Sequence, residues 1–540
     1  MTHVARKERT IALDAEYVEV DASGAEFRYR IGEDGCAHIV RCRSCATCVH
    51  IPEAISGCPV VGLDASSFAN LTKVQRIVCP RHLRHIGCRA FERCMDLCSI
   101  EFNDSLEAID AEAFLLCRSL DAVDLPCSLR KLGVNLAGAQ GARFDFRSTD
   151  IRISPESPYL FADEQGVVYE RTEDGLVLVD GTRFSGSVLT AHPQTIAIGV
   201  RALALNAQVE EVRLPEGCRR IEREAFRGCS SLRFVNFPDS LEEIQRAAFS
   251  CTALESVRLP RRCVRIHETA LVTGPVNPNT AGRPYAGSIR QISVDPLNPM
   301  FCMCGEVLCR RVASDLQAES NSAEREMLEA IACPNKVDEV NLPETVVRVS
   351  PYAFAGTTYI GHLNVSERIA CPEVGYLLPH LSCGRFTVRS VQPIGDIDTV
   401  SLEMPERGAT KKILEEAFAD GLNVERLLAA YDEALPSVSD RLVQARQMIA
   451  RLASPLLLAD GSRQLFESVI VGSLNTVCAN FGARSYWTGF EQMVDAGLLD
   501  AQSITAVIGM LTELGDAPAS GYLLGLKQRR FGKVLWDYDL

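Results

Sequence analysis

The sequence has few of the residues and motifs on which catalytic and metal sites most often depend. Its 540 residues include nine histidines and two tryptophans. The histidines are scattered and do not pair at the spacing that metal ligands need. No Gly-rich phosphate loop, His-Glu-x-x-His motif or Gly-x-Ser-x-Gly motif is present. We therefore expect a protein that is not an enzyme and that holds no cofactor.

An excess of positive charge and long apolar runs are also missing. The chain has 56 basic and 70 acidic residues, for a net charge of −14. This balance argues against nucleic acid as the main partner, because phosphate binding needs a basic surface. No run of 18 or more apolar residues occurs, so we expect no membrane span. The first 20 residues have no apolar core of a secretory signal, which predicts a cytoplasmic protein.

Cysteine, in contrast, is abundant. There are 22 cysteines, of which 21 precede residue 400. Cys94, Cys117 and Cys229 each follow an Ala-Phe pair by three residues, so they recur at one phase of a repeat. Such columns suit small buried side chains. We expect mostly free, buried thiols in a reducing compartment.

The repeat itself has a period of 23 residues. Phe68, Phe91 and Phe114 follow one another at this spacing, and Phe226 and Phe249 do so again. Within each copy, an apolar pattern such as Leu97-x-x-Ile100-x-Phe102 predicts a short strand with one buried face, and a Leu-x-x-Ile pair and a turn follow. One copy is too small to bury its own apolar residues, but stacked copies bury them against each other. A fixed period in the twenties is typical of a leucine-rich solenoid.

The segment from His85 to Cys94, with the order His-Ile-Gly-Cys-Arg-Ala-Phe-Glu-Arg-Cys, resembles the BspA-type leucine-rich repeat family. The resemblance covers roughly residues 30–400. It implies a β-rich solenoid that binds protein or other ligands through a curved sheet, often at bacterial surfaces. A cell-surface adhesin that is exported without a recognisable signal therefore stays open as an alternative.

We expect seven segments along the chain. They are an N-terminal capping segment at 1–60, a first repeat block at 61–142, a β-hairpin insertion at 143–200, a second repeat block at 201–272, a second hairpin insertion with a loop at 273–333, a terminal repeat segment at 334–404 and an α-helical domain at 405–540. Phe27, Tyr29 and Ile31 alternate with polar residues, which predicts an edge strand in the capping segment. Residues 312–330 are polar and predict an exposed loop or a short helix.

Beyond residue 400 the apolar spacing becomes helical, as in Val424, Leu427, Leu428 and Tyr431. Further helices are predicted at 437–453, 463–481, 486–497, 503–514 and 518–531. This part of the chain holds one cysteine, Cys478, and no histidine. An enzyme hidden in these helices is an alternative for which we find no pair of nucleophile and base.

Cys42, Cys45 and Cys48, with Cys58 nearby, form the clearest candidate for a metal site. Thiolates at short spacing can bind zinc or an iron–sulfur cluster. In a strand, however, Cys42 and Cys48 would point one way and Cys45 the other, which is a poor geometry for a shared ion. We favour a structural role, and a metal-binding or redox-sensing protein is the alternative.

The outward positions of the repeat strands are the remaining candidate site. They change from acidic in the first block to basic in the second, and Phe234 is their one aromatic residue. Our candidates for a binding face are Glu101, Asp124, Arg213, Phe234, Asn236, Arg258 and Asn341. We hypothesise that this change in charge orients an elongated partner on a non-catalytic, protein-binding scaffold.

Overall fold

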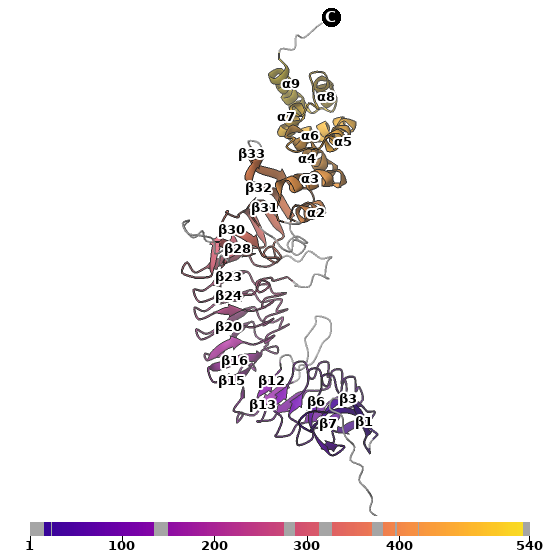
Figure 1. Ribbon diagram of the computed structural model, residues 1–540, viewed down its shortest axis with the longest axis vertical. Coiled ribbons are helices and arrows are strands. Elements are labelled where there is room, and N and C mark those ends of the chain that lie inside the picture. The colour runs from indigo at the N-terminus through magenta and orange to yellow at the C-terminus, as the bar shows by residue number, and fades with distance from the viewer. Residues whose placement is uncertain are drawn as a thin grey trace, which may run out of the picture. The chain divides into compact units, whose positions relative to one another are not determined.

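The computed structural model describes residues 16–22, 24–133, 150–274, 287–312, 327–369, 382–394, 397–418 and 421–532. The chain divides into two compact units, one of residues 1–277 with 287–302 and one of residues 278–286 with 303–540. A β-solenoid of about 13 turns occupies residues 37–389, and helices follow it (Figure 1). The predicted fold class, a leucine-rich solenoid with hairpin insertions and a helical C-terminal part, is confirmed.

In the first unit the turns of the solenoid build two series of parallel strands. The Leu-x-x-Ile pieces supply one series, with β10 paired to both β8 and β12. The first sheet of this series has the order β1(Tyr17–Val20), β2(Glu26–Ile31), β3(Ala37–Arg43), β6(Cys58–Leu63), β8(His85–Ile86), β10(Ala108–Ile109) and β12(Lys131–Leu132), and β5(Ala54–Ile55) pairs with β6. The second has the order β14(Leu160–Ala162), β15(Val168–Thr172), β16(Gly175–Asp180), β18(Thr195–Ile198), β20(Arg220–Ile221), β22(Glu243–Ile244) and β24(Arg265–Ile266).

The other series consists of the Leu-x-x-Ile-x-Phe pieces and carries the predicted binding face. It contains β4(Cys48–His50), β7(Arg76–Val78) and β9(Ser99–Glu101), then β11(Ala122–Leu125) with β13(Asp150–Ile153), then β17(Val188–Thr190), β19(Glu211–Arg213) and β21(Phe234–Val235), then β23(Ser256–Leu259) with β25(Gln291–Val294). Every pairing within this series is parallel. The register places residues 23 apart in sequence side by side, as in Glu211 and Phe234.

The second unit continues with two four-stranded sheets. One has the order β26(Phe301–Cys304), β27(Val307–Val312), β28(Met327–Ala332) and β30(Val346–Val349). The other has the order β29(Lys336–Asn341), β31(Tyr359–Ser366), β32(Ser382–Ile394) and β33(Ile397–Glu403). Strand β33 runs antiparallel to β32 and ends the strand-rich part of the chain.

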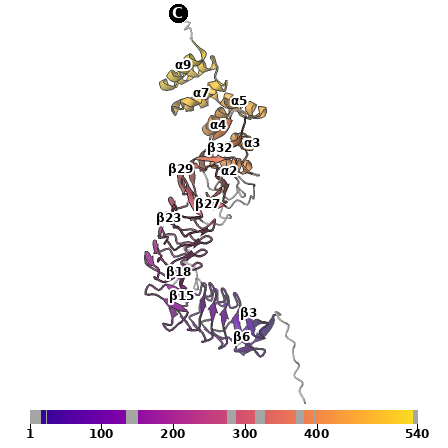
Figure 2. The same ribbon diagram turned by 60° about the vertical axis from the view of Figure 1, so that its left-hand side comes forward.

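The helices come after β33 and form a cluster of their own in both views of the ribbon (Figure 2). They are α2(Arg407–Ala417), α3(Val424–Ala434), the short 3-10 helix Leu435–Ser437, α4(Arg441–Ala453), α5(Asp460–Gly472), α6(Leu474–Ala483), α7(Trp487–Asp495), α8(Ser503–Glu513) and α9(Ala517–Phe531). Asn423 and Asp440 begin α3 and α4, since each side chain accepts from backbone N–H groups of the first turn.

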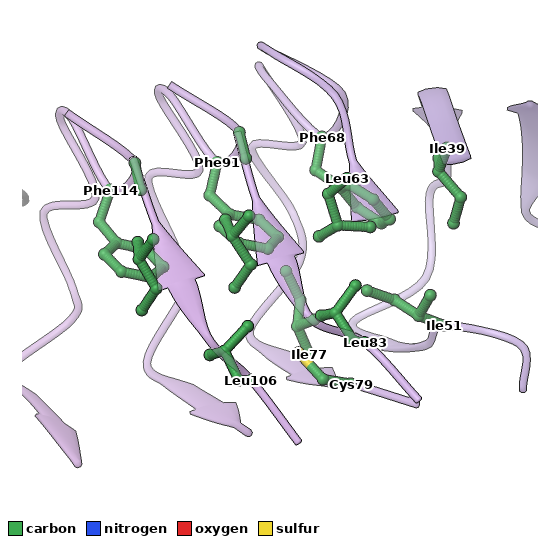
Figure 3. Packing of buried hydrophobic residues seen from close by; sticks show 14 of the residues in the cluster. Ile39, Ile51, Leu63, Phe68, Ile77, Cys79, Leu83, Phe91, Leu106 and Phe114 are labelled. Carbon is green, nitrogen blue, oxygen red and sulfur yellow. The ribbon is translucent and has the colours of Figure 1, made fainter. Parts of the chain in front are cut away.

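Phenylalanines from successive turns form the core of the solenoid. Phe68, Phe91 and Phe114 lie side by side and point into its interior (Figure 3). Their ring centroids are 5.5 Å apart for the first pair and 5.4 Å for the second, and none is more than 1% exposed. Phe226 and Phe249 stack in the same way at 5.3 Å. The 23-residue period of the sequence therefore corresponds to the spacing of the phenylalanines in this column.

Six turns of the solenoid place a non-glycine residue in the left-handed region two residues before the buried Phe or Leu of the turn. These residues are Ser66, Arg89, Glu112, Arg201, Glu224 and Ala247, with φ between 53° and 59°. Residues other than glycine adopt this backbone conformation at a free-energy cost of about 1 kcal/mol or more. Hydrogen bonds to the next turn offset the cost, since Ser66 donates to the carbonyl of Cys88 and Arg89 to that of Ala111.

Two expectations about single elements are wrong. The strand with Phe27, Tyr29 and Ile31 is β2, which lies between β1 and β3, because the more exposed β1 supplies the edge. The helix expected at 463–481 is two helices, α5 and α6, that meet at Ser473. The Ser473 hydroxyl donates to the carbonyl of Val469 at 2.8 Å, and Gly472 just before it favours a break. Most of the polar stretch 312–330 lies outside the described residues.

Candidate functional site

The first half of the predicted face has less free negative charge than the sequence indicates. Glu101 on β9 forms an ion pair with Arg76 on the neighbouring β7. Asp124 on β11 lies 3.8 Å from the guanidinium of Arg152 on β13. Register of parallel strands creates both pairs, because residues of consecutive turns become neighbours. The two carboxylates are exposed but largely neutralised.

The second half of the face combines exposed apolar and cationic side chains. Val188, Glu211 and Phe234 form one row across β17, β19 and β21. Val188 is 39% exposed and Phe234 is 50% exposed. Arg213, in the next row, is 2.7 Å from Glu211. Arg258 on β23 is exposed, and no ion pair with it is found in the described part of the chain.

Two of the predicted face residues hold the sheet together. Asn236 accepts from the N–H of Leu214 at 2.6 Å and donates to the carbonyl of the same residue at 2.8 Å. Its side chain therefore replaces a strand hydrogen bond between two turns. Asn341 in the second unit accepts from the amide of Asn364 on β31. Of the seven predicted residues, Phe234 and Arg213 lie on neighbouring strands of one sheet, and Arg258 is exposed on a later strand of the same series.

The cysteine cluster is spread over three elements. Cys42 is buried in β3, Cys45 is exposed after it, and Cys48 and Cys58 lie half-buried on β4 and at the start of β6. Burial raises the pKa of the Cys42 thiol to about 12. Within the described ranges, no group of three or more Cys, His, Asp or Glu side chains is arranged to hold a metal ion.

The repeat-phase cysteines act as hydrogen-bond donors. The thiols of Cys94 and Cys117 donate to the carbonyls of Phe68 and Phe91, at 3.2 and 3.1 Å. Cys229 donates to the carbonyl of Leu203 at 3.0 Å, and burial raises its pKa to about 12. Thr357 occupies the same phase of a later turn, and its hydroxyl donates to the carbonyl of Pro334 at 3.0 Å. These four side chains are thus small donors that reach the preceding turn, whereas Thr252 at the same phase donates to the carbonyl of Phe249 in its own turn at 2.8 Å.

A cavity of about 500 Å³ lies in the second unit, between β33 and the helices, and no sequence pattern predicts it. Its polar lining includes Arg385, Glu403, Arg446, Gln447 and Gln492. Glu403 lies 3.6 Å from the guanidinium of Arg385 and 3.1 Å from that of Arg446. These residues come from two strands and two helices, so no local motif connects them.

A buried ion pair supports the helical wall of this cavity. The guanidinium of Arg451 on α4 donates to both carboxylate oxygens of Asp432 on α3, at 2.6 and 2.7 Å. Both side chains are 5% exposed. The hydroxyl of Tyr431 donates to the carbonyl of Glu403 at 2.7 Å, and burial raises the pKa of this tyrosine. Helices α3 and α4 are thereby tied to the end of β33.

The one cysteine of the helical part is not an activated nucleophile. This cysteine, Cys478 on α6, is buried, and burial raises the pKa of the thiol to about 12. A thiol with such a pKa stays protonated at neutral pH.

None of the helices in the described ranges is both long and apolar enough to cross a membrane.

Comparison with known proteins relates the repeats to one family. Residues 46–138 and 196–273 match the BspA type leucine rich repeat region, in six copies. Among solved structures, the chain is similar to a leucine-rich repeat protein of T. pallidum, with 25% identity over 40% of this chain and 81% of that chain and a TM-score of 0.23. No curated protein matches the sequence.

Two further solved structures are similar over more of the chain. A leucine rich cell surface protein from Faecalibacterium prausnitzii has 18% identity over 66% of this chain and 73% of that chain, with a TM-score of 0.29. The pneumococcal vaccine antigen PcpA has 15% identity over 68% of this chain and 97% of that chain, with a TM-score of 0.36.

Proposed function

The repeats at residues 46–138 and 196–273 are BspA-type leucine-rich repeats, and on this premise we propose that the chain is a non-catalytic scaffold that binds another protein. The proposed face is the series of strands from β17 to β25. A solenoid suits this task, because its stacked turns present one extended surface of parallel strands.

The observation that carries the proposal is the exposed row on β17, β19 and β21. Phe234 and Val188 expose apolar surface on either side of Glu211, Arg213 lies in the next row of the same sheet, and Arg258 is exposed on β23, which belongs to the same strand series. Aromatic and arginine side chains are over-represented among residues that dominate binding energy. We therefore propose an acidic partner surface with an apolar patch that covers Phe234.

The test is quantitative affinity capture with the immobilised full chain and two variants. In the first, Phe234→Ser and Arg258→Glu change the proposed face. In the second, Arg265→Glu changes an exposed arginine on β24, which belongs to the other strand series. A partner that is lost with the first variant and kept with the second supports the proposal. Equal capture by wild type and both variants would refute it.

We also propose that the protein works in a reducing compartment. The support is the thiol column, because Cys94, Cys117 and Cys229 contribute S–H donors that oxidation would remove. Thiols in the cytoplasm are kept reduced by glutathione and thioredoxin. Fractionation of the native cells, with thiol labelling of the unfolded protein, tests this. Recovery at the cell surface or with oxidised column cysteines would contradict it.

A further inference from the structure

Strand β33 lies at the edge of its sheet. Alternate main-chain N–H and C=O groups along it point away from the neighbouring strand. Strand β33 is the last strand of the order β29-β31-β32-β33, and no other strand in the described part of the chain pairs with it. Met404, just after it, donates to the carbonyl of Gly384 at 3.0 Å. Because hydrogen-bonded pairs alternate in an antiparallel ladder, the backbone groups of Thr399, Ser401 and Glu403 point outward.

The outward direction leads into the cavity beside the helices. At Glu403 the outward carbonyl accepts from the hydroxyl of Tyr431 at 2.7 Å and from the side-chain amide of Gln447 at 3.0 Å. The helices therefore already cover this end of the strand. The next outward positions, Ser401 and Thr399, line the cavity of about 500 Å³. Their main-chain groups border empty space where a further strand would lie.

Three polar atoms of the cavity are buried and have no partner in the described part of the chain. They are Nε of Arg446, Oε1 of Gln447 and Oε1 of Gln492. Gln447 is 3% exposed, and its amide nitrogen already donates to Glu403, so its free oxygen needs a donor. Buried polar atoms without partners cost free energy, about 1–3 kcal/mol each. None of the three atoms has surface accessible to water, so an occupant can bond them only after their side chains turn toward the cavity.

We propose that this cavity binds an extended polypeptide segment of a partner, which adds to β33 as one more strand. A polypeptide main chain carries donors and acceptors in alternation, which matches the open edge of β33 at Thr399 and Ser401. Arg385, Arg446 and Arg451 against Glu403 and Asp432 leave one positive charge at the site, which favours a segment with a carboxylate.

The apolar part of the lining defines a further preference of the segment. Leu428 on α3, Ala450 on α4 and Leu456 after it border the same cavity. An extended segment with one apolar side chain next to the carboxylate would fill this space. The site uses no residue of the face from β17 to β25, so it goes beyond the function proposed above and can fail or succeed separately.

The probe is a library of random heptapeptides displayed on phage and selected on the immobilised full chain. We expect enriched peptides with an acidic residue beside an apolar one. Synthetic copies are then N-methylated at one amide at a time. Methylation should weaken binding at least tenfold at every second position and little at the positions between, because alternate amides of a strand face its neighbour.

Two variants at Ser401 distinguish the contribution of its main-chain N–H to peptide binding from that of its side chain. Ser401→Pro removes the outward N–H but no hydrogen bond to β32, and should weaken binding of the selected peptides at least tenfold. Ser401→Ala keeps the N–H and should change binding less than twofold. Gln492→Leu removes one free acceptor and should weaken binding about tenfold.

The outcomes separate the two proposals. Peptides that bind the Arg258→Glu variant as tightly as wild type, but lose affinity for Ser401→Pro, support the site at β33. Failure to enrich any peptide, or an N-methyl scan without alternation, overturns it. The scan uses the wild-type chain, so it decides the question even where Ser401→Pro folds poorly. Selected peptides that depend on Arg258 would instead belong to the other face.

Discussion

Replacing Cys229 by threonine and by valine tests the donor column of the solenoid. The thiol is buried, and its S–H reaches the carbonyl of Leu203 in the preceding turn at 3.0 Å. The same carbonyl also accepts from the N–H of Asn206 at 3.0 Å. Loss of the thiol therefore leaves the Leu203 carbonyl with one hydrogen bond instead of two. We expect this to lower the free energy of unfolding by about 0.5–1.5 kcal/mol.

Threonine and valine have nearly the same shape, so any cost of fitting a branched side chain at residue 229 is shared. Threonine retains a donor, as Thr357 does at this phase of a later turn. Valine has none but is the more apolar of the two. Without a hydrogen bond, a buried hydroxyl would make threonine the less stable variant by about 1–3 kcal/mol. The sign of the difference therefore reports on the hydrogen bond.

We expect Cys229→Thr to be more stable than Cys229→Val by about 1 kcal/mol. Urea unfolding of the full chain, followed by the circular dichroism of the strands, measures the difference between the two midpoints at a common slope. The matched exposed control is Cys127→Thr against Cys127→Val, since Cys127 is exposed and the pair should differ little. A Cys229→Val variant as stable as Cys229→Thr would refute the donor role of the column.

Three further predictions concern stability. Phe91→Ala should lower the free energy of unfolding by about 3–5 kcal/mol, whereas Phe234→Ala should change it by less than about 0.5 kcal/mol, as measured by urea unfolding. The pKa of Glu224 lies below its usual value, because hydrogen bonds from two arginines outweigh burial. Its contribution is thus present above the unfolded pKa of about 4.3 and lost as pH falls through the lower folded value, so Glu224→Gln should destabilise at pH 7, and this difference should shrink as the pH falls through the folded pKa; a pH-independent difference would contradict this. Asp432→Ala should cost about 3–5 kcal/mol because it leaves Arg451 buried without a carboxylate, and the double variant with Arg451→Met should recover most of that loss in thermal unfolding.

The proposed binding face could be predicted from sequence only in part. Alternation along each strand placed Phe234 and Arg258 on the outside, because side chains of a strand point to opposite faces in turn. It could not distinguish them from Asn236, whose amide bonds Leu214 of the preceding turn. Nor could it show that Arg76 and Arg152 neutralise Glu101 and Asp124, since these pairs depend on the register between turns.

The amino-acid sequence by itself determined the solenoid. A column of phenylalanines at 23-residue spacing, with Leu-x-x-Ile pieces between, leaves stacking as the way to bury every apolar residue, so Phe68, Phe91 and Phe114 had to meet. Local spacing also located most of the helices, as in α3 with Val424, Leu427, Leu428 and Tyr431 on its buried side.

Only the tertiary structure decided which surfaces are open. The cavity beside β33 combines Ser401 of a strand with Gln447 of α4 and Gln492 of α7, and its free polar atoms exist because these elements meet at one place. A repeat pattern specifies contacts between neighbouring turns. It carries no information about where the last strand meets the helices, because those contacts join residues without a fixed separation in the chain.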